Sequence, residues 1–176
     1  MSAGRKNNNK NKDWNTPPKY AELIKNFFNN NINLDPCFNI YSLIPAEVKF
    51  TLPCKNGLTE EWNHKNIFVN PPYGRNSESK TSIYSWLEKG LISNQKYKSE
   101  ILYLIPVACN TKHFKNIIFK YFTGICFLFD TRLKFWYEGK EMTKGAPMAC
   151  CIVYIGKDYK KFKEVFQNSG ACFEIL

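Results

Sequence analysis

Four consecutive residues, Asn70-Pro71-Pro72-Tyr73, carry the clearest chemical pattern in the sequence. Asn70 offers a side-chain carbonyl acceptor, and the two prolines, which lack an N–H, stiffen the turn and can aim the Pro71 carbonyl outward. Tyr73 adds an aromatic face. Two aimed acceptors beside a stacking ring suit a planar ring with an exocyclic amino group, whose nitrogen lone pair is then directed at an electrophile. The simpler alternative is that Pro-Pro-Tyr only ends a strand.

A second polar pattern, Leu34-Asp35-Pro36-Cys37, ends an earlier apolar segment. Ligands of an open α/β sheet bind outside the carboxyl ends of its strands. We therefore expect Asp35 and the Asn70 motif to flank one binding site. Taken without that motif, Asp35 is better explained as a turn or capping residue.

The elements that must position these residues alternate between helices and apolar strands. We expect a helix with Thr16 as its N-cap and Pro17 in its first turn. Periodicity predicts the remaining elements, which are strands at 32–35, 48–52, 66–70, 101–105 and 125–129, helices from residue 83, over 112–122 and over 159–166, and a hairpin of 132–137 with 148–155. The pattern predicts an α/β fold with a mostly parallel sheet and a late antiparallel hairpin.

Length and composition fit one folded domain. The chain has 176 residues, of which 44% are hydrophobic and 16% aromatic, and this is enough to build a core. Residues 1–12 are polar, basic and low in complexity, so we expect a disordered tail followed by a single domain over 13–176. No apolar run is long enough to span a membrane, and we expect no membrane partner.

The net charge of +10 favours an anionic partner, with nucleic acid as the first candidate. AT-rich coding would also enrich a chain in Lys, Asn and Ile, and composition leaves both explanations open. The seven cysteines form no CxxC pair, and His64 and His113 lack ligand-type neighbours, so we expect no metal and no disulfide framework. A reducing, cytoplasmic compartment fits this cysteine usage best.

Four basic residues are candidates for contacts with nucleic-acid phosphates. Arg75 and Lys80 flank the loop after the Asn70 motif, and Arg132 and Lys134 lie in the predicted hairpin. The alternatives are ordinary solvated loop charge for the first pair and protection of an edge hairpin against aggregation for the second.

Several motifs in order resemble the small phage-type DNA N6-adenine methyltransferases (Dam-like, with an Asn-Pro-Pro-Tyr motif). They cover nearly all of the chain after the tail, and they are Asp13-Trp14-Asn15-Thr16-Pro17, Leu34-Asp35-Pro36-Cys37, Asn56-Gly57-Leu58 before Trp62, Phe68 to Gly74, Leu104 to Val107, Thr111 to Phe114, Arg132-Leu133-Lys134-Phe135 and Ala146-Pro147. The resemblance implies a Rossmann-like class I methyltransferase fold that uses S-adenosylmethionine to methylate the N6 of adenine in DNA. It makes 13–176 a catalytic domain.

The resemblance also implies roles for individual residues. Asn70, Pro71 and Tyr73, with Pro72 completing the catalytic motif, would hold and stack the target adenine. Asp35 and Pro36, together with Asn70, would lie at the cofactor. The segment from Trp14 through Thr16 to Pro17 would close over the cofactor. Because N6 must be reached for in-line attack, the adenine would be flipped out of the DNA stack.

Two departures from the broader methyltransferase pattern shape our expectations. No glycine-rich turn follows Asp35, and the interval 35–70 is short, so we expect a trimmed sheet. The rival functions are a methyltransferase of the same chemistry acting on RNA or on a protein glutamine, and a nucleic-acid-binding protein that has lost catalysis. We expect a monomer or weak dimer located in the cytoplasm, which would be a host cytoplasm if the protein is phage- or virus-encoded.

Overall fold

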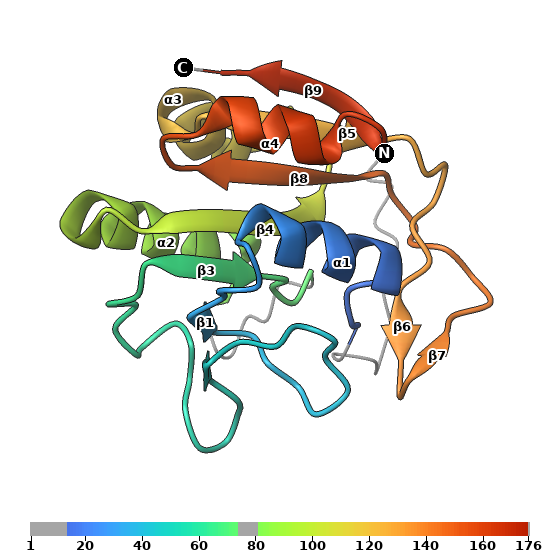
Figure 1. Cartoon of the computed structure of the whole chain (residues 1–176), viewed down its shortest axis with the longest axis horizontal. Helices are drawn as coiled ribbons and strands as arrows, with labels where there is room; N and C mark the ends of the chain where they lie inside the picture. Colours follow the sequence, from blue (N-terminus) through green and yellow to red (C-terminus); the bar gives the residue numbers. More distant parts are fainter. Residues whose placement is uncertain (1–13, 74–80, 176) are drawn as a thin grey trace, which may run out of the picture.

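A computed structural model describes residues 14–73 and 81–175 (Figure 1). A seven-stranded sheet has the order β2-β1-β3-β4-β8-β5-β9. Its strands are β1 (Leu34–Asp35), β2 (Val48–Lys49), β3 (Asn66–Val69), β4 (Glu100–Pro106), β5 (Gly124–Leu128), β8 (Cys150–Ile155) and β9 (Gly170–Glu174). The first four are mutually parallel, while β8 runs antiparallel to β4 and β5, and β9 runs antiparallel to β5. Five strands therefore share one direction, which confirms the predicted α/β fold with a mostly parallel sheet.

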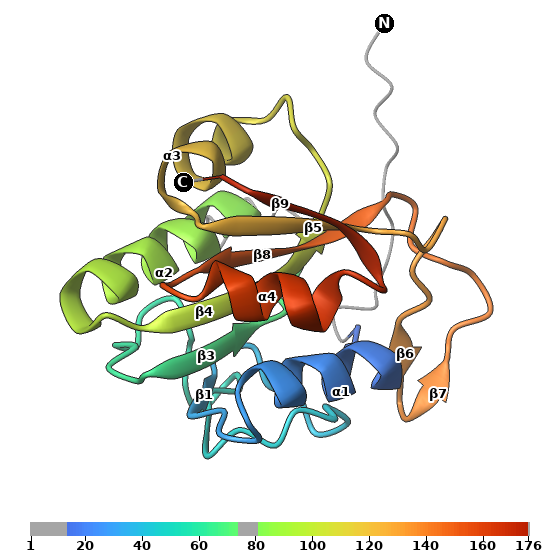
Figure 2. The same cartoon turned by 45° about the horizontal axis from the view of Figure 1, so that its top comes forward.

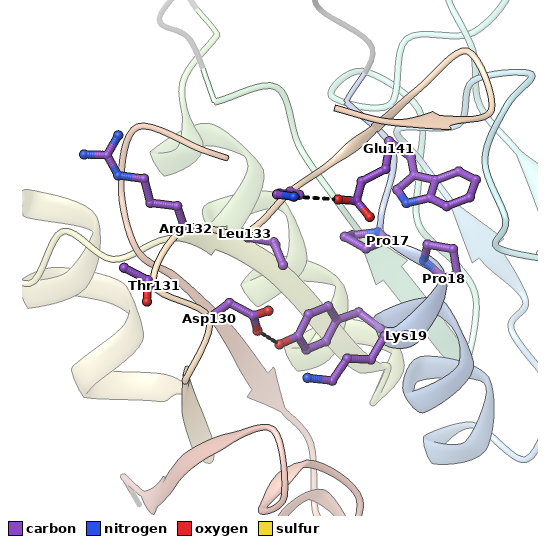
Figure 3. Close-up of a pocket in the computed structure, with 11 residues that line it drawn as sticks. Pro17, Pro18, Lys19, Asp130, Thr131, Arg132, Leu133 and Glu141 are labelled. Atoms are coloured by element: carbon purple, nitrogen blue, oxygen red, sulfur yellow. Dashed lines mark hydrogen bonds and ion pairs between the residues drawn. The ribbon is translucent and has the colours of Figure 1, made fainter. Parts of the chain in front are cut away.

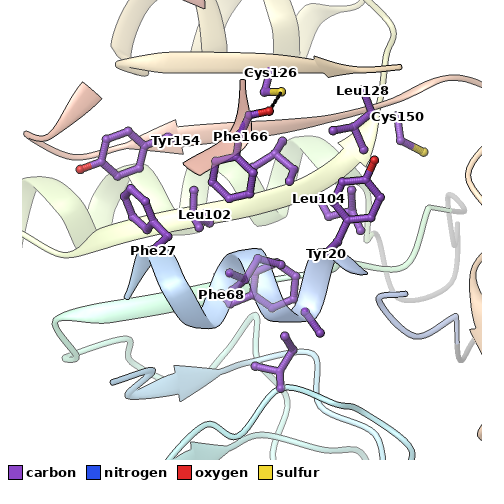
Figure 4. Packing of buried hydrophobic residues seen from close by; sticks show 14 of the residues in the cluster. Tyr20, Phe27, Phe68, Leu102, Leu104, Cys126, Leu128, Cys150, Tyr154 and Phe166 are labelled. Atoms are coloured by element: carbon purple, nitrogen blue, oxygen red, sulfur yellow. Dashed lines mark hydrogen bonds between the residues drawn. The ribbon is translucent and has the colours of Figure 1, made fainter. Parts of the chain in front are cut away.

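Helices cover both faces of the sheet (Figure 2). They are α1 (Pro18–Phe27), α2 (Ile83–Tyr97), the π-helical turn η1 (Phe114–Ile118), α3 (Phe119–Tyr121) and α4 (Tyr159–Phe166). One core cluster joins α1 and α4 to Leu102 and Leu104 of β4 (Figure 4), and the other joins α2 and η1 to Ile101 and Tyr103. Neighbouring β4 residues thus face opposite layers, which explains why this strand is apolar from Ile101 to Pro106. No helix in the described ranges is long and apolar enough to cross a membrane.

The start of α1 corrects the expected cap. The helix begins at Pro18, Pro17 occupies the N-cap position with ψ of 149°, and no side chain caps it. A residue that precedes proline is driven into extended backbone by the proline ring. Because Pro17 itself precedes a proline, the helix cannot start before Pro18, and Thr16 is not the N-cap.

The prediction of a hairpin between residues 132–137 and 148–155 is wrong. A small separate ribbon forms instead between β6 (Trp136–Tyr137) and β7 (Lys140–Glu141), turning through Glu138 and Gly139, which both have positive φ. That pair of conformations suits a two-residue hairpin. β8 lies between β4 and β5 with all six residues buried, because a wholly apolar strand needs cover on both faces.

Smaller differences concern element lengths. The segments 32–35 and 48–52 contribute only two strand residues each, and the segment 112–122 forms η1 and α3 rather than one α-helix. Strand β9 was not anticipated. It is short and half-exposed at the sheet edge, where apolar periodicity is weak.

Candidate functional site

The two polar strand ends meet at the point where the strand order reverses. From β1 the chain passes to β2 on one side, and it then returns to form β3 on the other side of β1. Leu34 of β1 pairs in parallel with Ile67 of β3, so Asp35 and the following Asn70 motif lie at the same edge of the sheet. Such a switch point is where open α/β sheets bind ligands.

Asp35 supplies a buried ionisable group at this edge. Its side chain is only 3% exposed, and one carboxylate oxygen accepts a hydrogen bond of 2.9 Å from the Cys37 amide. Burial raises the pKa of Asp35 to about 7, against the opposing effects of that amide, of Lys49 and of Ser42. A buried carboxyl poised in this way gains from a bound cation, because the cation would offset the cost of ionisation.

The segment Asn56-Gly57-Leu58 packs against the Asp35 turn. A Cβ on Gly57 would lie 2.2 Å from the Pro36 carbonyl oxygen and 3.0 Å from the Trp86 ring, so only glycine permits this approach. The Trp62 indole N–H donates to the Gly57 carbonyl at 2.7 Å. Gly57 therefore positions the turn after β1, a role that the sequence motif alone did not reveal.

Asn70 is oriented by the N-terminal segment of the described chain. Its Nδ2 donates a hydrogen bond of 2.8 Å to the Trp14 carbonyl oxygen. A carbonyl can only accept, so the amide nitrogen must face Trp14 and the amide oxygen must face away from it. The side-chain oxygen is thus the group that Asn70 can present to a ligand. Pro71 is buried and Pro72 is exposed, as expected for a stiff turn leaving the sheet.

Tyr73 lies in an aromatic cluster with Trp14 and Phe135. Trp14 stacks on Phe135 with 5.1 Å between ring centroids, and Tyr73 meets both rings edge-on. The Tyr73 hydroxyl donates to the Leu104 carbonyl at 3.1 Å, and burial raises the pKa of Tyr73, which keeps it a neutral donor. The sequence alone assigns no role to Phe135, whereas in the structure its ring supports Trp14.

Trp14 is a candidate ligand contact in a segment that is anchored elsewhere in the fold. Among the described residues, its indole Nε1 is buried without a hydrogen-bond partner. The neighbouring Asn15 exchanges backbone hydrogen bonds with Trp136 of β6, at 2.7 and 3.0 Å. The segment 14–17 therefore ties the Asn70 turn to the β6–β7 ribbon. Thr16 and Pro17 are buried within this segment.

A cavity of about 460 Å³ lies beside this segment, between the start of α1 and the residues that follow β5 (Figure 3). Lys134 and Glu141 form an ion pair of 3.0 Å at its wall, and Asp130 accepts a hydrogen bond from Tyr20. Arg132 extends its guanidinium away from that ion pair and is exposed. Of the two predicted cations, Lys134 is thus engaged within the protein, whereas Arg132 makes no ion pair within the described ranges.

The predicted site residues fall into four groups. Asn70, Tyr73 and Trp14 form one contact network, and Asp35 with Pro36 lies at the adjoining end of β1. Pro17, Arg132 and Lys134 line the cavity. Arg75 and Lys80, like the expected tail over 1–12, lie outside the described residues. Within residues 14–73 and 81–175, no cluster of three or more His, Cys, Asp or Glu side chains could hold a metal ion.

A comparison with protein families gives a match over nearly the whole chain. The model of the family described as DNA N-6-adenine-methyltransferase (Dam) matches residues 4–171, nearly the whole chain. No curated protein and no solved structure matches it.

Proposed function

The chain belongs to the DNA N-6-adenine-methyltransferase (Dam) family, and from its site we propose that it transfers a methyl group from S-adenosylmethionine to the N6 of a flipped adenine in DNA. The observation that carries the proposal is the orientation of Asn70. Its side-chain nitrogen is held by the Trp14 carbonyl at the switch point, which leaves its oxygen to accept from a substrate amine. We also propose that the domain is a Rossmann-like class I methyltransferase fold, because the site lies at such a switch point.

The residues at the end of β1 fit the cofactor. S-adenosylmethionine carries an ammonium and a carboxylate, and when bound it supplies an electrophilic methyl group on a sulfonium sulfur. The buried Asp35 carboxyl would hold a positive group, and the unpartnered Trp14 Nε1 could donate to an acceptor. Pro36 would line this part of the site, and Thr16 and Pro17 would help to close it.

The Asn70 turn would act on the target amine. Hydrogen bonds from the two N6 hydrogens to the Asn70 side-chain oxygen and the Pro71 carbonyl would draw the lone pair out of conjugation with the ring. Pro72 keeps the turn stiff, and Tyr73 would present its ring to the adenine. The amine would attack without a covalent enzyme intermediate, so catalysis would come from positioning and electrostatics.

DNA is the substrate that the family and the charge favour together. The net charge of +10 suits a polyanion, and Arg132 at the cavity is available for phosphate. We propose that Arg75 and Lys80 add to this surface, whereas Lys134 is held by its ion pair with Glu141. An adenine taken out of the stack would reach the Asn70 turn from the same edge of the sheet.

The test compares two asparagines at opposite ends of β3, namely Asn66, its first residue, and Asn70, which directly follows its last. Purified wild type, Asn70→Ala and Asn66→Ala would be incubated with labelled S-adenosylmethionine and unmodified DNA, and N6-methyladenine would be quantified. Asn66 is the matched control, because its Nδ2 also donates to a backbone carbonyl (that of Asn31, at 2.7 Å) but at the opposite end of the strand. We expect Asn70→Ala to lower the rate about 100-fold or more, and Asn66→Ala to leave it nearly unchanged.

Other outcomes would overturn the proposal in identifiable ways. Equal activity of wild type and Asn70→Ala would remove Asn70 from the mechanism. Methyl transfer only to RNA or to a protein glutamine would replace the substrate. Retention of DNA with no cofactor binding by calorimetry would favour a binding protein that has lost catalysis.

A further inference from the structure

Two cysteines far apart in the sequence face one another on neighbouring strands. Cys126 of β5 is the direct partner of Cys172 of β9 in the antiparallel register. The Phe129 amide donates to the Ser169 carbonyl at 3.0 Å, so Phe129 and Ser169 form a hydrogen-bonded pair. Such pairs recur at every second residue, and Cys126 lies an odd number of residues from Phe129. The cysteines therefore occupy a pair without mutual backbone hydrogen bonds.

The other end of the β5–β9 pair gives the same alternation of hydrogen-bonded and non-hydrogen-bonded residue pairs. The Ile175 amide donates to the Thr123 carbonyl at 2.9 Å, and Thr123 is again an odd number of residues from Cys126. In pairs of this type the Cα atoms lie about 4.5 Å apart and the side chains approach each other most closely. That separation is within the range that disulfides require, about 4.4–6.8 Å.

The two thiols differ in their accessibility to solvent. Cys126 is fully buried, and its sulfur points to the Phe166 carbonyl of α4 at 3.7 Å (Figure 4). A Cβ on Gly170 would lie 2.5 Å from that sulfur, so the thiol is confined. Cys172 is half-buried, and the neighbouring Cys126 thiol and the positive charge of Lys163 lower its pKa. Cys172 is thus the thiol that an external reagent can reach first.

We propose that Cys126 and Cys172 form an oxidative modification site, at which a small disulfide oxidant such as oxidised glutathione converts the two thiols to a β5–β9 disulfide. The Cys172 thiolate attacks one glutathione sulfur, forming a mixed disulfide and releasing the first glutathione thiolate. The Cys126 sulfur, losing its proton, attacks Cys172 and releases the second. Two thiols are oxidised, one glutathione disulfide is reduced to two glutathione molecules, and both protons end on glutathione.

The remaining cysteines offer no such arrangement. Cys54 and Cys109 are exposed, and Cys37 lies outside the strands. Cys150 and Cys151 are sequential residues of one strand and point to opposite faces. Among the paired strands of the described residues, only β5 and β9 place cysteine opposite cysteine. The cross-link would close a loop that contains the β6–β7 ribbon, β8 and α4, and it would fix the edge strand β9.

The experiment uses the full chain in a Cys54→Ser/Cys109→Ser background, which removes the exposed thiols. After incubation with oxidised glutathione, intact-mass analysis should show the loss of two hydrogens without a retained glutathione. Peptide mapping should join the Cys126 and Cys172 peptides. We expect the melting temperature to rise by about 5–15 °C, and dithiothreitol to reverse the rise.

Two variants keep the test decisive. Cys172→Ser in the same background should show neither the mass loss nor the rise in melting temperature. If Cys172→Ser does not fold, Cys126→Ala replaces it as the control, with the same expected result. A stable glutathione adduct on Cys172, two unreacted thiols in the wild-type pair, or a cross-link to another cysteine would each overturn the proposal. Mass and melting temperature are read without DNA or S-adenosylmethionine, so these outcomes are separate from the methyltransferase test.

Discussion

Replacing Asp35 with asparagine should stabilise the protein while weakening the site. Asp35 is buried, and its pKa is about 7 in the folded chain instead of 3.8. Asparagine keeps an oxygen of the same shape to accept from the Cys37 amide at 2.9 Å, but it carries no charge. The substitution therefore removes the cost of ionising a buried carboxyl and changes little else in the turn.

The size and sign of the effect follow from the raised pKa. Below about pH 4, Asp35 is protonated in both the folded and the unfolded chain, and the favourable contribution of the neutral carboxyl is fully present. As the pH rises toward 7 this contribution is lost, because the unfolded chain releases its proton first. Each difference of one in pKa corresponds to about 1.4 kcal/mol, so the loss reaches about 4 kcal/mol above pH 7. That value is the upper limit for the gain from Asp35→Asn.

Urea unfolding at pH 5 and pH 8 measures this gain. The unfolding midpoint of Asp35→Asn should exceed that of wild type clearly at pH 8 and by much less at pH 5, with equal m-values. Asp158→Asn, which removes an exposed carboxylate at the N-cap of α4, controls for the loss of charge alone and should give no gain. A variant no more stable than wild type at pH 8, or a gain independent of pH, would refute the reasoning. Separately, calorimetry should show weaker S-adenosylmethionine binding by Asp35→Asn.

Two further predictions concern the aromatic cluster and the DNA surface. Tyr73→Phe should lower the free energy of unfolding by about 1–2 kcal/mol, because the Leu104 carbonyl loses its 3.1 Å hydrogen-bond partner. The variant should still methylate DNA, since the aromatic ring remains. Abolished methylation with unchanged stability in urea would contradict this prediction. Arg132→Ala should weaken DNA binding and reduce the slope of log affinity against log salt concentration by about 1. Lys134→Ala should have little effect on either quantity, because Lys134 is paired with Glu141. Equal salt slopes for the two variants would show that the ion pair does not matter.

The local elements were predictable wherever burial imposes a regular period on the sequence. The buried part of β4, the amphipathic α2 and α4 of 159–166 follow directly from apolar spacing. The start of α1 was also within reach, because the second proline of the pair fixes it. Strand partners were not predictable in this way. β8 is far from both β4 and β5 in the chain, and its apolar residues show only that it is buried, not between which strands.

The candidate site shows the same division between local and distant effects. Residue types alone indicated that Asn70 offers a side-chain acceptor and that Asp35 ends a strand. They could not indicate that the Trp14 carbonyl holds the Asn70 amide, since this contact spans 56 residues. Nor could they assign Phe135 or Gly57, whose roles depend on a stacked ring and on a close backbone approach.

These distant contacts explain why motifs spread along the chain belong to one chemical unit. The side chain of Asn70 is oriented by the Trp14 carbonyl, and the Trp14 ring rests on Phe135. Asn15, next to Trp14, pairs with Trp136 in the ribbon. The orientation of the acceptor at the end of β3 therefore depends on a ribbon formed far along the chain. A substitution at Phe135 should therefore disturb the orientation of Asn70 indirectly, because the stacked Phe135 ring helps to hold Trp14 together with the Asn15–Trp136 pairing.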